Sequence, residues 1–366
     1  MNRSHLFART LLAGVVLWAQ TAPARGQAST DTTPRLGALV ESMSEPGGYF
    51  DTDNLVSNEA SYVQVIDKLE PVGGAYIGVG PEQNFNYIAR SRPTWAFIVD
   101  VRRDNMIHVL LLTAVLAEAA TPADYLAMLF SRKVEIEANS ELEATVRAIA
   151  SAKSSEADFE RNLARVRKTL ENEFAVVLPT ADWERLARFY VTYFQAGLRL
   201  SFTSHGLSGW GRYPSYQDLA LARTPSDQPA HFLASDEDYQ FVRALARNGR
   251  LVPVVGDFAG DTALRAVGRF LREHNEAVST FYTSNVEFYL ARSRSFGAWV
   301  ENVRSLPLHK DATFIRAYFD YGRRHPQSVP GTRSTMVRQH VSTFLELWDQ
   351  GEFRSYWDVS VRDALP

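Results

Sequence analysis

The chain has 366 residues and a mass of 41.1 kDa, which is enough for one large domain or two smaller ones. Hydrophobic residues make up 45% of it and aromatic residues 12%, so disorder is excluded as its general state. Its 39 basic and 42 acidic side chains give a formal net charge of −3, which offers no electrostatic basis for a nucleic-acid partner or an anionic membrane surface. The absence of cysteine excludes disulfides, thiolate metal sites and cysteine nucleophiles.

Residues 1–28 are predicted to be a secretory signal peptide. Arg3 and Arg9 place positive charge before an apolar run from Leu11 to Ala19, and small residues follow at two candidate cleavage positions. That run is short for a membrane span, so we expect an exported protein, periplasmic or secreted, that keeps no membrane contact after cleavage. An uncleaved anchor helix or a misassigned start codon is the alternative. Residues 29–45 are polar, and a flexible leader is expected there.

Two strand–helix pairs are predicted after a first helix at residues 53–69. The short apolar runs at residues 74–80 and 94–100 predict strands, and residues 84–90 and 106–120 predict the helices that follow them. Both strands are apolar along their whole length. Such strands, alternating with helices, are typical of a parallel sheet that is covered on both faces.

A long helical stretch then separates the second predicted strand from the third. Its patterns over residues 121–250 are mostly helical, and we expect a large helical insertion there. The alternation resumes afterwards, with strands expected at residues 251–258, 278–284 and 313–318, and helices at residues 261–275, 285–303 and 335–350. Residues 46–366 therefore predict a single α/β domain with a Rossmann-like, mostly parallel sheet, helices on both faces and this insertion.

Two glycines and an acid follow the first two predicted strands at a spacing that suits a nucleotide. Gly78 and Gly80 end the first strand, and Asp100 ends the second, 20 residues after Gly80. Such glycines let a ligand approach backbone N–H groups, and such an acid can accept hydrogen bonds from ribose hydroxyls. A plain turn with a helix-capping acid explains the same residues. Gln83 stands where a dinucleotide fingerprint has its third glycine, and no Gly-Lys-Ser/Thr occurs, so NAD and ATP are disfavoured by these routes.

Polar residues also follow the third and fourth predicted strands. Asp257 can receive an adenine amino group while the ring packs near Phe258, or it can serve as a turn or cap residue before the next helix. Asn285 and Glu287 are candidate catalytic residues, because polar groups at this edge of a sheet can orient a substrate. The alternative is that Ser284 or Asn285 caps the helix that follows.

His205 is a further candidate catalytic residue. It lies between serines in a glycine-rich loop, which suggests a Ser–His hydrolase, although no G-x-S-x-G motif occurs and an ordinary loop histidine is the alternative. The eight histidines show no H-E-x-x-H and no paired ligand spacing, so no metal is expected. A small-molecule ligand is the partner that the sequence favours. It indicates no oligomeric state.

The four strand ends together resemble those of class I S-adenosylmethionine-dependent methyltransferases, over roughly residues 55–120 and 250–320. A closer resemblance is to an uncharacterised bacterial family, the LIC_10091-like proteins, which carry a domain of unknown function. It covers most of residues 46–360 and rests on GGYFDTDNLVSNEASY, GGAYIGVGPEQNFNYIA, FIVDVRRDN and FYTSNVEFYL. This second resemblance implies a fold but no established activity.

The methyltransferase resemblance implies a role for each strand-end residue. Gly78 and Gly80 would line the methionine part of S-adenosylmethionine, Asp100 would hold its ribose, and Asp257 its adenine. Methyltransferases usually have an acid two residues before the first glycine and a third glycine further on.

The chain departs from that pattern at both positions, with Tyr76 and Glu82. We expect a methyltransferase-like protein that binds S-adenosylmethionine or another small nucleotide-like ligand. One alternative is an exported binding or interaction module that keeps the fold without activity. Another is a hydrolase that uses His205 or residues 283–287.

Overall fold

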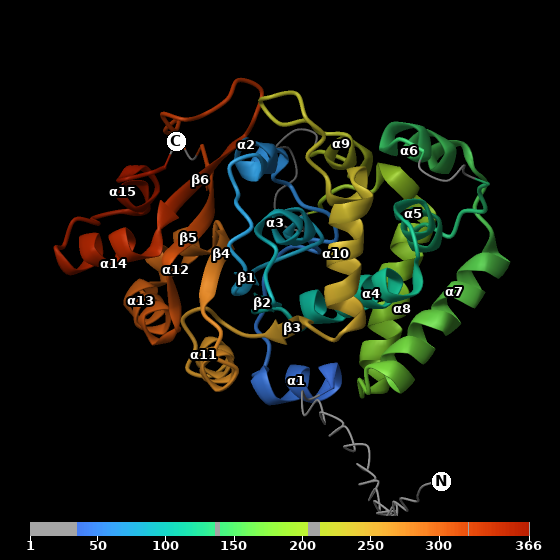
Figure 1. Ribbon diagram of the computed structural model, residues 1–366, viewed down its shortest axis with the longest axis horizontal. Coiled ribbons are helices and arrows are strands. Elements are labelled where there is room, and N and C mark those ends of the chain that lie inside the picture. The colour runs from blue at the N-terminus through green and yellow to red at the C-terminus, as the bar shows by residue number, and fades with distance from the viewer. Residues whose placement is uncertain (1–34, 136–139, 204–212, 321, 366) are drawn as a thin grey trace, which may run out of the picture. The chain divides into compact units, whose positions relative to one another are not determined.

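The computed structural model describes residues 35–135, 140–203, 213–320 and 322–365. The predicted signal peptide at residues 1–28 lies outside these ranges. Within them the chain forms a sheet in the order β3-β2-β1-β4-β5-β6, in which β1 to β5 are parallel and β6 is antiparallel to β5 (Figure 1). Its strands are β1 (Ala75–Gly78), β2 (Trp95–Asp100), β3 (Leu251–Val255), β4 (Val278–Ser284), β5 (Leu308–Phe319) and β6 (Ser334–His340). The five predicted strands and the mostly parallel α/β sheet are thus confirmed.

Helices surround the sheet. They are α1 (Leu36–Met43), α2 (Val63–Ile66), α3 (Asn84–Ser91), α4 (Arg103–Glu118), α5 (Pro122–Leu129), α6 (Leu142–Ser151), α7 (Glu156–Lys168), α8 (Thr180–Ala196), α9 (Tyr216–Ala220), α10 (Asp236–Arg247), α11 (Ala263–Glu273), α12 (Val286–Ser293), α13 (Phe296–Ser305), α14 (Val341–Asp349) and α15 (Tyr356–Val361). α11, α13 and α14 lie on one side of the sheet, and α3, α4 and α10 lie on the other (Figure 1).

The two faces of the sheet bury different side chains. Every residue of β1, β2 and β3 is buried, which requires an apolar strand sequence on both faces. Trp95 of β2 packs its ring edge-on against Phe270 of α11, with 4.8 Å between the ring centroids. On the opposite face, the ring of Tyr282 in β4 lies 4.9 Å from that of Tyr87 in α3. Pro253 is tolerated in β3 because that strand is an edge strand paired only with β2.

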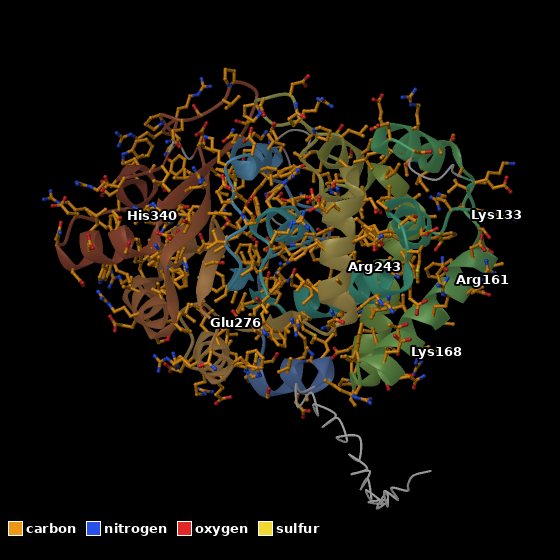
Figure 2. The ribbon with its side chains drawn as sticks, in the orientation of Figure 1. Lys133, Arg161, Lys168, Arg243, Glu276 and His340 are labelled. Atoms are coloured by element: carbon orange, nitrogen blue, oxygen red, sulfur yellow. The ribbon has the colours of Figure 1, made fainter. Side chains whose placement is uncertain are left out.

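The described chain between β2 and β3 is mainly helical and forms α4 to α10. α4 contacts both β2 and β3, whereas α5 to α8 extend away from the sheet (Figure 1). The exposed side chains of Lys133, Arg161 and Lys168 lie on the outer side of this helical part (Figure 2). Among the described helices, each is too short or too polar to cross a membrane.

Three predicted elements differ from the structure. The leader expected at residues 29–45 includes α1, which buries Leu36, Leu39, Val40 and Met43 and contacts β3. The helix predicted at residues 53–69 is reduced to a 3-10 turn at Ala60–Tyr62 and to α2, because Asn54 has a φ of +49° and the carbonyls of Thr52 and Asp53 accept hydrogen bonds from Arg102. The helix predicted at residues 335–350 is β6 followed by α14, since the edge of β5 pairs with residues 334–340.

Candidate functional site

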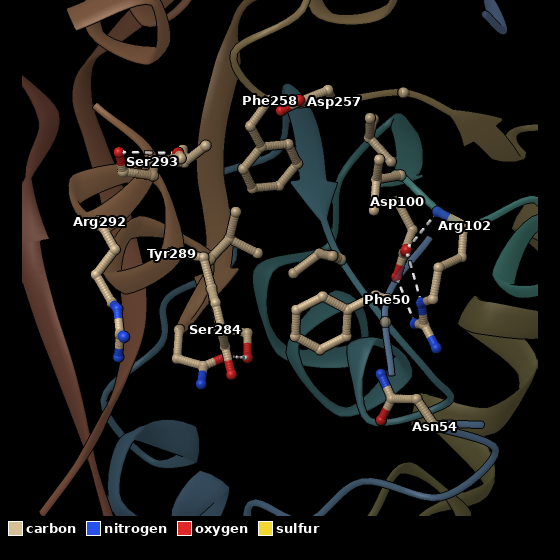
Figure 3. A pocket seen from close by; sticks show the side chains of 18 residues that line it. Phe50, Asn54, Asp100, Arg102, Asp257, Phe258, Ser284, Tyr289, Arg292 and Ser293 are labelled. Carbon is tan, nitrogen blue, oxygen red and sulfur yellow. Dashed lines mark hydrogen bonds and ion pairs between the residues drawn. The ribbon is translucent and has the colours of Figure 1, made fainter. Parts of the chain in front are cut away.

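A pocket of about 680 Å³ opens at the carboxyl ends of β1, β2, β3 and β4 (Figure 3). The strand order explains its position, because the chain leaves β1 toward β2 and β3 on one side and β4 lies on the other, and the loops diverge there. Residues 79–80, 99–102 and 256–258 line it at three strand ends, together with Ser284, several residues of α12, and Phe50 and Asn54.

The walls of this pocket are mainly apolar and include three aromatic rings. Phe50 and Tyr289 meet edge-on with their ring centroids 4.9 Å apart, and Phe258 lies at the far side (Figure 3). Two lining residues, Asn54 and the exposed Arg292, add polar groups. Pockets of this size and composition, with a few placed polar groups, are typical of small-molecule sites.

The two predicted glycines have different positions. Gly80 lines the pocket with a φ of +83°, where a side chain would be strained. Gly78 does not line it. A Cβ on Gly78 would lie 2.0 Å from Oδ1 of Asn84 and 2.8 Å from the hydroxyl of Tyr76, which donates a 2.8 Å hydrogen bond to that Oδ1. The missing side chain of Gly78 therefore makes room for an internal hydrogen bond.

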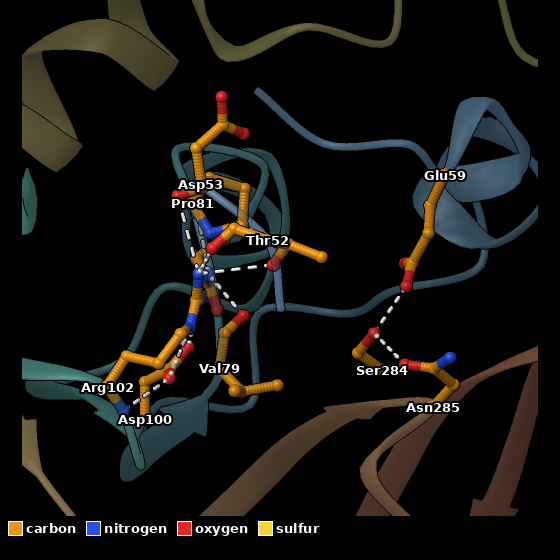
Figure 4. A network of polar contacts seen from close by, with 10 residues as sticks. Thr52, Asp53, Glu59, Val79, Pro81, Asp100, Arg102, Ser284 and Asn285 are labelled. Atoms are coloured by element: carbon orange, nitrogen blue, oxygen red, sulfur yellow. Dashed lines mark hydrogen bonds and ion pairs between the residues drawn. The ribbon is translucent and has the colours of Figure 1, made fainter. Parts of the chain in front are cut away.

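Asp100 lies at the pocket wall and is paired with Arg102. Its Oδ1 accepts hydrogen bonds from the backbone N–H (2.9 Å) and Nε (3.0 Å) of Arg102, and its Oδ2 accepts from Nη2 at 2.7 Å. Both side chains are buried. Nη1 of Arg102 also donates to the carbonyl oxygens of Thr52 (3.2 Å) and Asp53 (3.4 Å) (Figure 4). Sequence reasoning missed Arg102 as the partner that balances the charge of Asp100.

Residues 45–54, which we call the strap, cross this edge of the sheet. The backbone N–H of Glu45 donates to the carbonyl of Val255, the last residue of β3, at 3.0 Å. The backbone N–H of Gly48 donates to the carbonyl of Val101 at 2.7 Å. Arg102 fixes the far end of the strap through Thr52, as described above. The strap thereby carries Phe50 to the pocket.

Asp257 lines the pocket and also forms a turn. Its side chain is exposed, and its Oδ1 accepts a 2.9 Å hydrogen bond from the backbone N–H of Ala259. Its own backbone N–H donates to Oε1 of Glu45 at 2.7 Å. Asp257 therefore forms the turn that was the alternative interpretation, and it also lines the pocket at the strand ends.

Ser284 ends β4 and contacts a buried carboxylate that the sequence did not reveal as a partner. Its hydroxyl donates to Oε1 of Glu59 (Figure 4). Oε2 of Glu59 accepts from the hydroxyl of Tyr282 (2.6 Å) and from Nε2 of Gln83 (3.1 Å). Burial raises the pKa of Glu59 above its ordinary value, and the three hydrogen bonds oppose that rise. Asn285 lines the pocket, and α12 begins without a side-chain cap, so the capping alternative is not met.

Glu287 was a candidate catalytic residue, and the structure places it in the core instead. Its Oε2 accepts hydrogen bonds from Nε of Arg316 at 2.5 Å and from the hydroxyl of Thr283 at 3.3 Å, and its Oε1 accepts from Nε1 of Trp299 at 3.2 Å. The side chains of Glu287 and Arg316 both have 0% exposure. Three residues after Ser284, the helix has turned this carboxylate away from the pocket and toward β5.

The remaining candidate, His205, lies outside the described residues. Within the described ranges, no group of histidine and acidic side chains has an arrangement that could hold a metal ion.

The chain matches the model of one protein family over residues 54–194 and 214–359. Apart from Phe50, all the residues that line the pocket lie within these ranges. No curated protein matches the chain. The match agrees with the expected membership of an uncharacterised family, and its description names no activity. The chain belongs to the family described as Domain of unknown function (DUF7790).

Proposed function

We propose that this protein binds a small nucleoside-like molecule, with S-adenosylmethionine as the first candidate, in the pocket at the carboxyl edge of the sheet. The observation that carries the proposal is the convergence of Gly80, Asp100, Asp257 and Asn285 on one pocket that also holds aromatic rings. These residues come from the ends of four strands that are spread over about 200 positions of the sequence. The sheet order also supports a Rossmann-like fold, because the doubly wound order 3-2-1-4-5-6 binds nucleotides where the strand order reverses.

The pocket suits the two halves of a nucleoside differently. Its apolar lining near Phe258 accepts a flat ring, and Asp257 at the rim has a carboxylate for an exocyclic amino group. Asp100 has already accepted three N–H groups of Arg102, out of about four acceptor positions on a carboxylate. One further hydrogen bond from a ribose hydroxyl is therefore the most that Asp100 can add.

Isothermal titration of the full chain with S-adenosylmethionine, S-adenosylhomocysteine and adenosine tests the proposal. We expect binding of at least one of them, and about tenfold weaker binding by Asp257→Ala, because a lost hydrogen bond to a charged group is worth about 1.5 kcal/mol or more. Asp261→Ala is the matched control, since this exposed aspartate four residues further on pairs with Arg265 outside the pocket. Folded protein that gives no heat with any of the three ligands refutes the proposal.

Binding without methyl transfer is the second candidate. The pairing of Asp100 with Arg102 and the burial of Tyr76 and Glu82, which stand where methyltransferases have other residues, support it. Radiolabelled S-adenosylmethionine, incubated with the protein and a panel of small-molecule and protein acceptors, separates the two. Binding with no transferred label favours the second candidate, and label on an acceptor favours a methyltransferase.

Export is also proposed, and it rests on the charge and hydropathy pattern of residues 1–28. The N-terminal sequence of the chain isolated from its own cells tests it. A mature chain that begins close to residue 29 supports export, whereas an intact Met1 in a cytoplasmic fraction contradicts it.

A further inference from the structure

Ser284 occupies a strained turn between a strand and a helix. It is the last residue of β4, α12 begins two residues later at Val286, and its φ of +51° is in the left-handed region, which is unusual for a residue other than glycine. Backbone strain of this kind is concentrated at functional sites. The turn brings a partly exposed serine to the pocket wall (Figure 3), beside Asn285 (Figure 4).

A carboxylate is held against the Ser284 hydroxyl. Glu59 is 2% exposed, and its Oε2 is fixed by Tyr282 and Gln83, so its other oxygen, Oε1, is left to accept the hydrogen bond from Ser284 (Figure 4). The two partners are 225 positions apart in the chain. Burial is the largest influence on the pKa of Glu59 and raises it, which makes this carboxylate a better proton acceptor than an exposed glutamate.

We propose that Ser284 is a nucleophile and Glu59 its general base, in a site that hydrolyses carboxylic esters with an apolar acyl or alcohol part. The Oγ of Ser284 forms a bond to the carbonyl carbon while its proton passes to Glu59. The bond from that carbon to the alcohol oxygen then breaks, and Glu59 returns the proton to the leaving oxygen. Water attacks the acyl-serine in the same manner and restores both side chains.

The surroundings of Ser284 fit this chemistry. The backbone N–H groups that open α12 follow it directly, and N–H groups at a helix start can donate to an oxyanion. The apolar lining of the pocket, with Phe50, Tyr289 and Leu290, favours an ester that has an apolar part. The inference rests on the hydrogen bond to Glu59 and on the turn, so it is independent of nucleoside binding. No G-x-S-x-G motif marks Ser284, because Tyr282 and Val286 stand at the glycine positions.

A fluorophosphonate probe on the full chain tests the nucleophile, because attack by the Oγ forms an O–P bond and releases fluoride. We expect one covalent adduct, which peptide mass spectrometry locates at Ser284 and which Ser284→Ala abolishes. Ser293→Ala is the matched control. Its hydroxyl also belongs to a pocket-lining residue, but it donates to the carbonyl of Leu290 and not to a carboxylate. Folded protein without an adduct at Ser284, under conditions that label a known serine hydrolase, overturns the proposal.

Substitution of Glu59 tests the base. Glu59→Gln keeps the shape and removes the basic oxygen, so we expect labelling of Ser284 to slow by about 100-fold or more. Where Glu59→Gln does not fold, Glu59→Asp serves instead, because it keeps the carboxylate and draws it back by one methylene. We expect it to slow labelling at least tenfold. A labelling rate within twofold of the wild type, in a folded variant of either kind, overturns the assignment of Glu59.

Discussion

Substitution of Arg316 by methionine should lower the free energy of unfolding by about 3–5 kcal/mol, the usual effect of removing one partner of a buried ion pair. Arg316 and Glu287 both have 0% side-chain exposure, and the Nε–Oε2 distance between them is 2.5 Å. Without the guanidinium, the carboxylate of Glu287 keeps two neutral donors, the indole of Trp299 and the hydroxyl of Thr283. Because Glu287 has 0% side-chain exposure, its charge is not hydrated by bulk solvent, and methionine fills much of the vacated volume. The loss should therefore come mainly from the uncompensated charge.

Urea unfolding followed by tryptophan fluorescence measures the effect. Arg147→Met is the matched control, because Arg147 pairs with Glu143 at 75% and 71% exposure and such a surface pair contributes less than about 1 kcal/mol. The double variant Glu287→Met with Arg316→Met removes both charges and should regain most of the loss. Two results would refute the reasoning. One is an Arg316→Met loss below about 1 kcal/mol, and the other is a double variant no more stable than Arg316→Met alone.

Three further predictions follow from the structure. Gly78→Ala should destabilise the protein by about 1–3 kcal/mol in urea unfolding, because its Cβ would overlap Asn84, whereas a Gly297→Ala control in α13 should not destabilise it. Burial raises the pKa of Glu82 to about 7, so the stability that this protonated group contributes is fully present below its ordinary pKa of 4.5 and is lost as the pH rises through 7. The unfolding free energy of Glu82→Gln relative to wild type should therefore improve by about 3 kcal/mol across that window, and an unchanged difference would contradict this. Arg102→Met should loosen the end of the strap at Thr52 and Asp53 and speed cleavage there in limited proteolysis, and an unaltered cleavage rate would count against the tether.

The sheet was predictable because its parallel strands are buried on both faces. Strands such as Leu251–Val255 are short and continuously apolar, and few other structures accommodate that pattern between helices. β6 was missed for a different reason. Val337 and Val341 are four residues apart, which suits a helix, and only the antiparallel pairing with β5 makes Ser334–His340 a strand. α1 was missed because polar residues surround its short apolar stripe, which is buried only by packing against distant elements, β3 and α11.

The site was predictable only as far as strand ends mark it. Asp100 ends a strand, Asp257 and Asn285 follow strands, and parallel strands bring their carboxyl ends to one edge. Which polar groups meet there depends on contacts between distant segments. The hydrogen bond from Ser284 to Glu59 is one such contact, and no local spacing reveals it. Glu287 shows the opposite error, because its place in the first turn of a helix does not reveal whether its side chain faces the pocket or the core.

The residues that line the pocket lie partly inside and partly outside the family match. The floor of the pocket comes from strand ends inside the family match, whereas Phe50 precedes residue 54, where that match begins. A relative whose chain differs before that point would keep the same sheet edge and present another wall to the ligand. Exchange of residues 45–53 between family members is therefore a way to change what the pocket accepts while the framework beneath it stays the same.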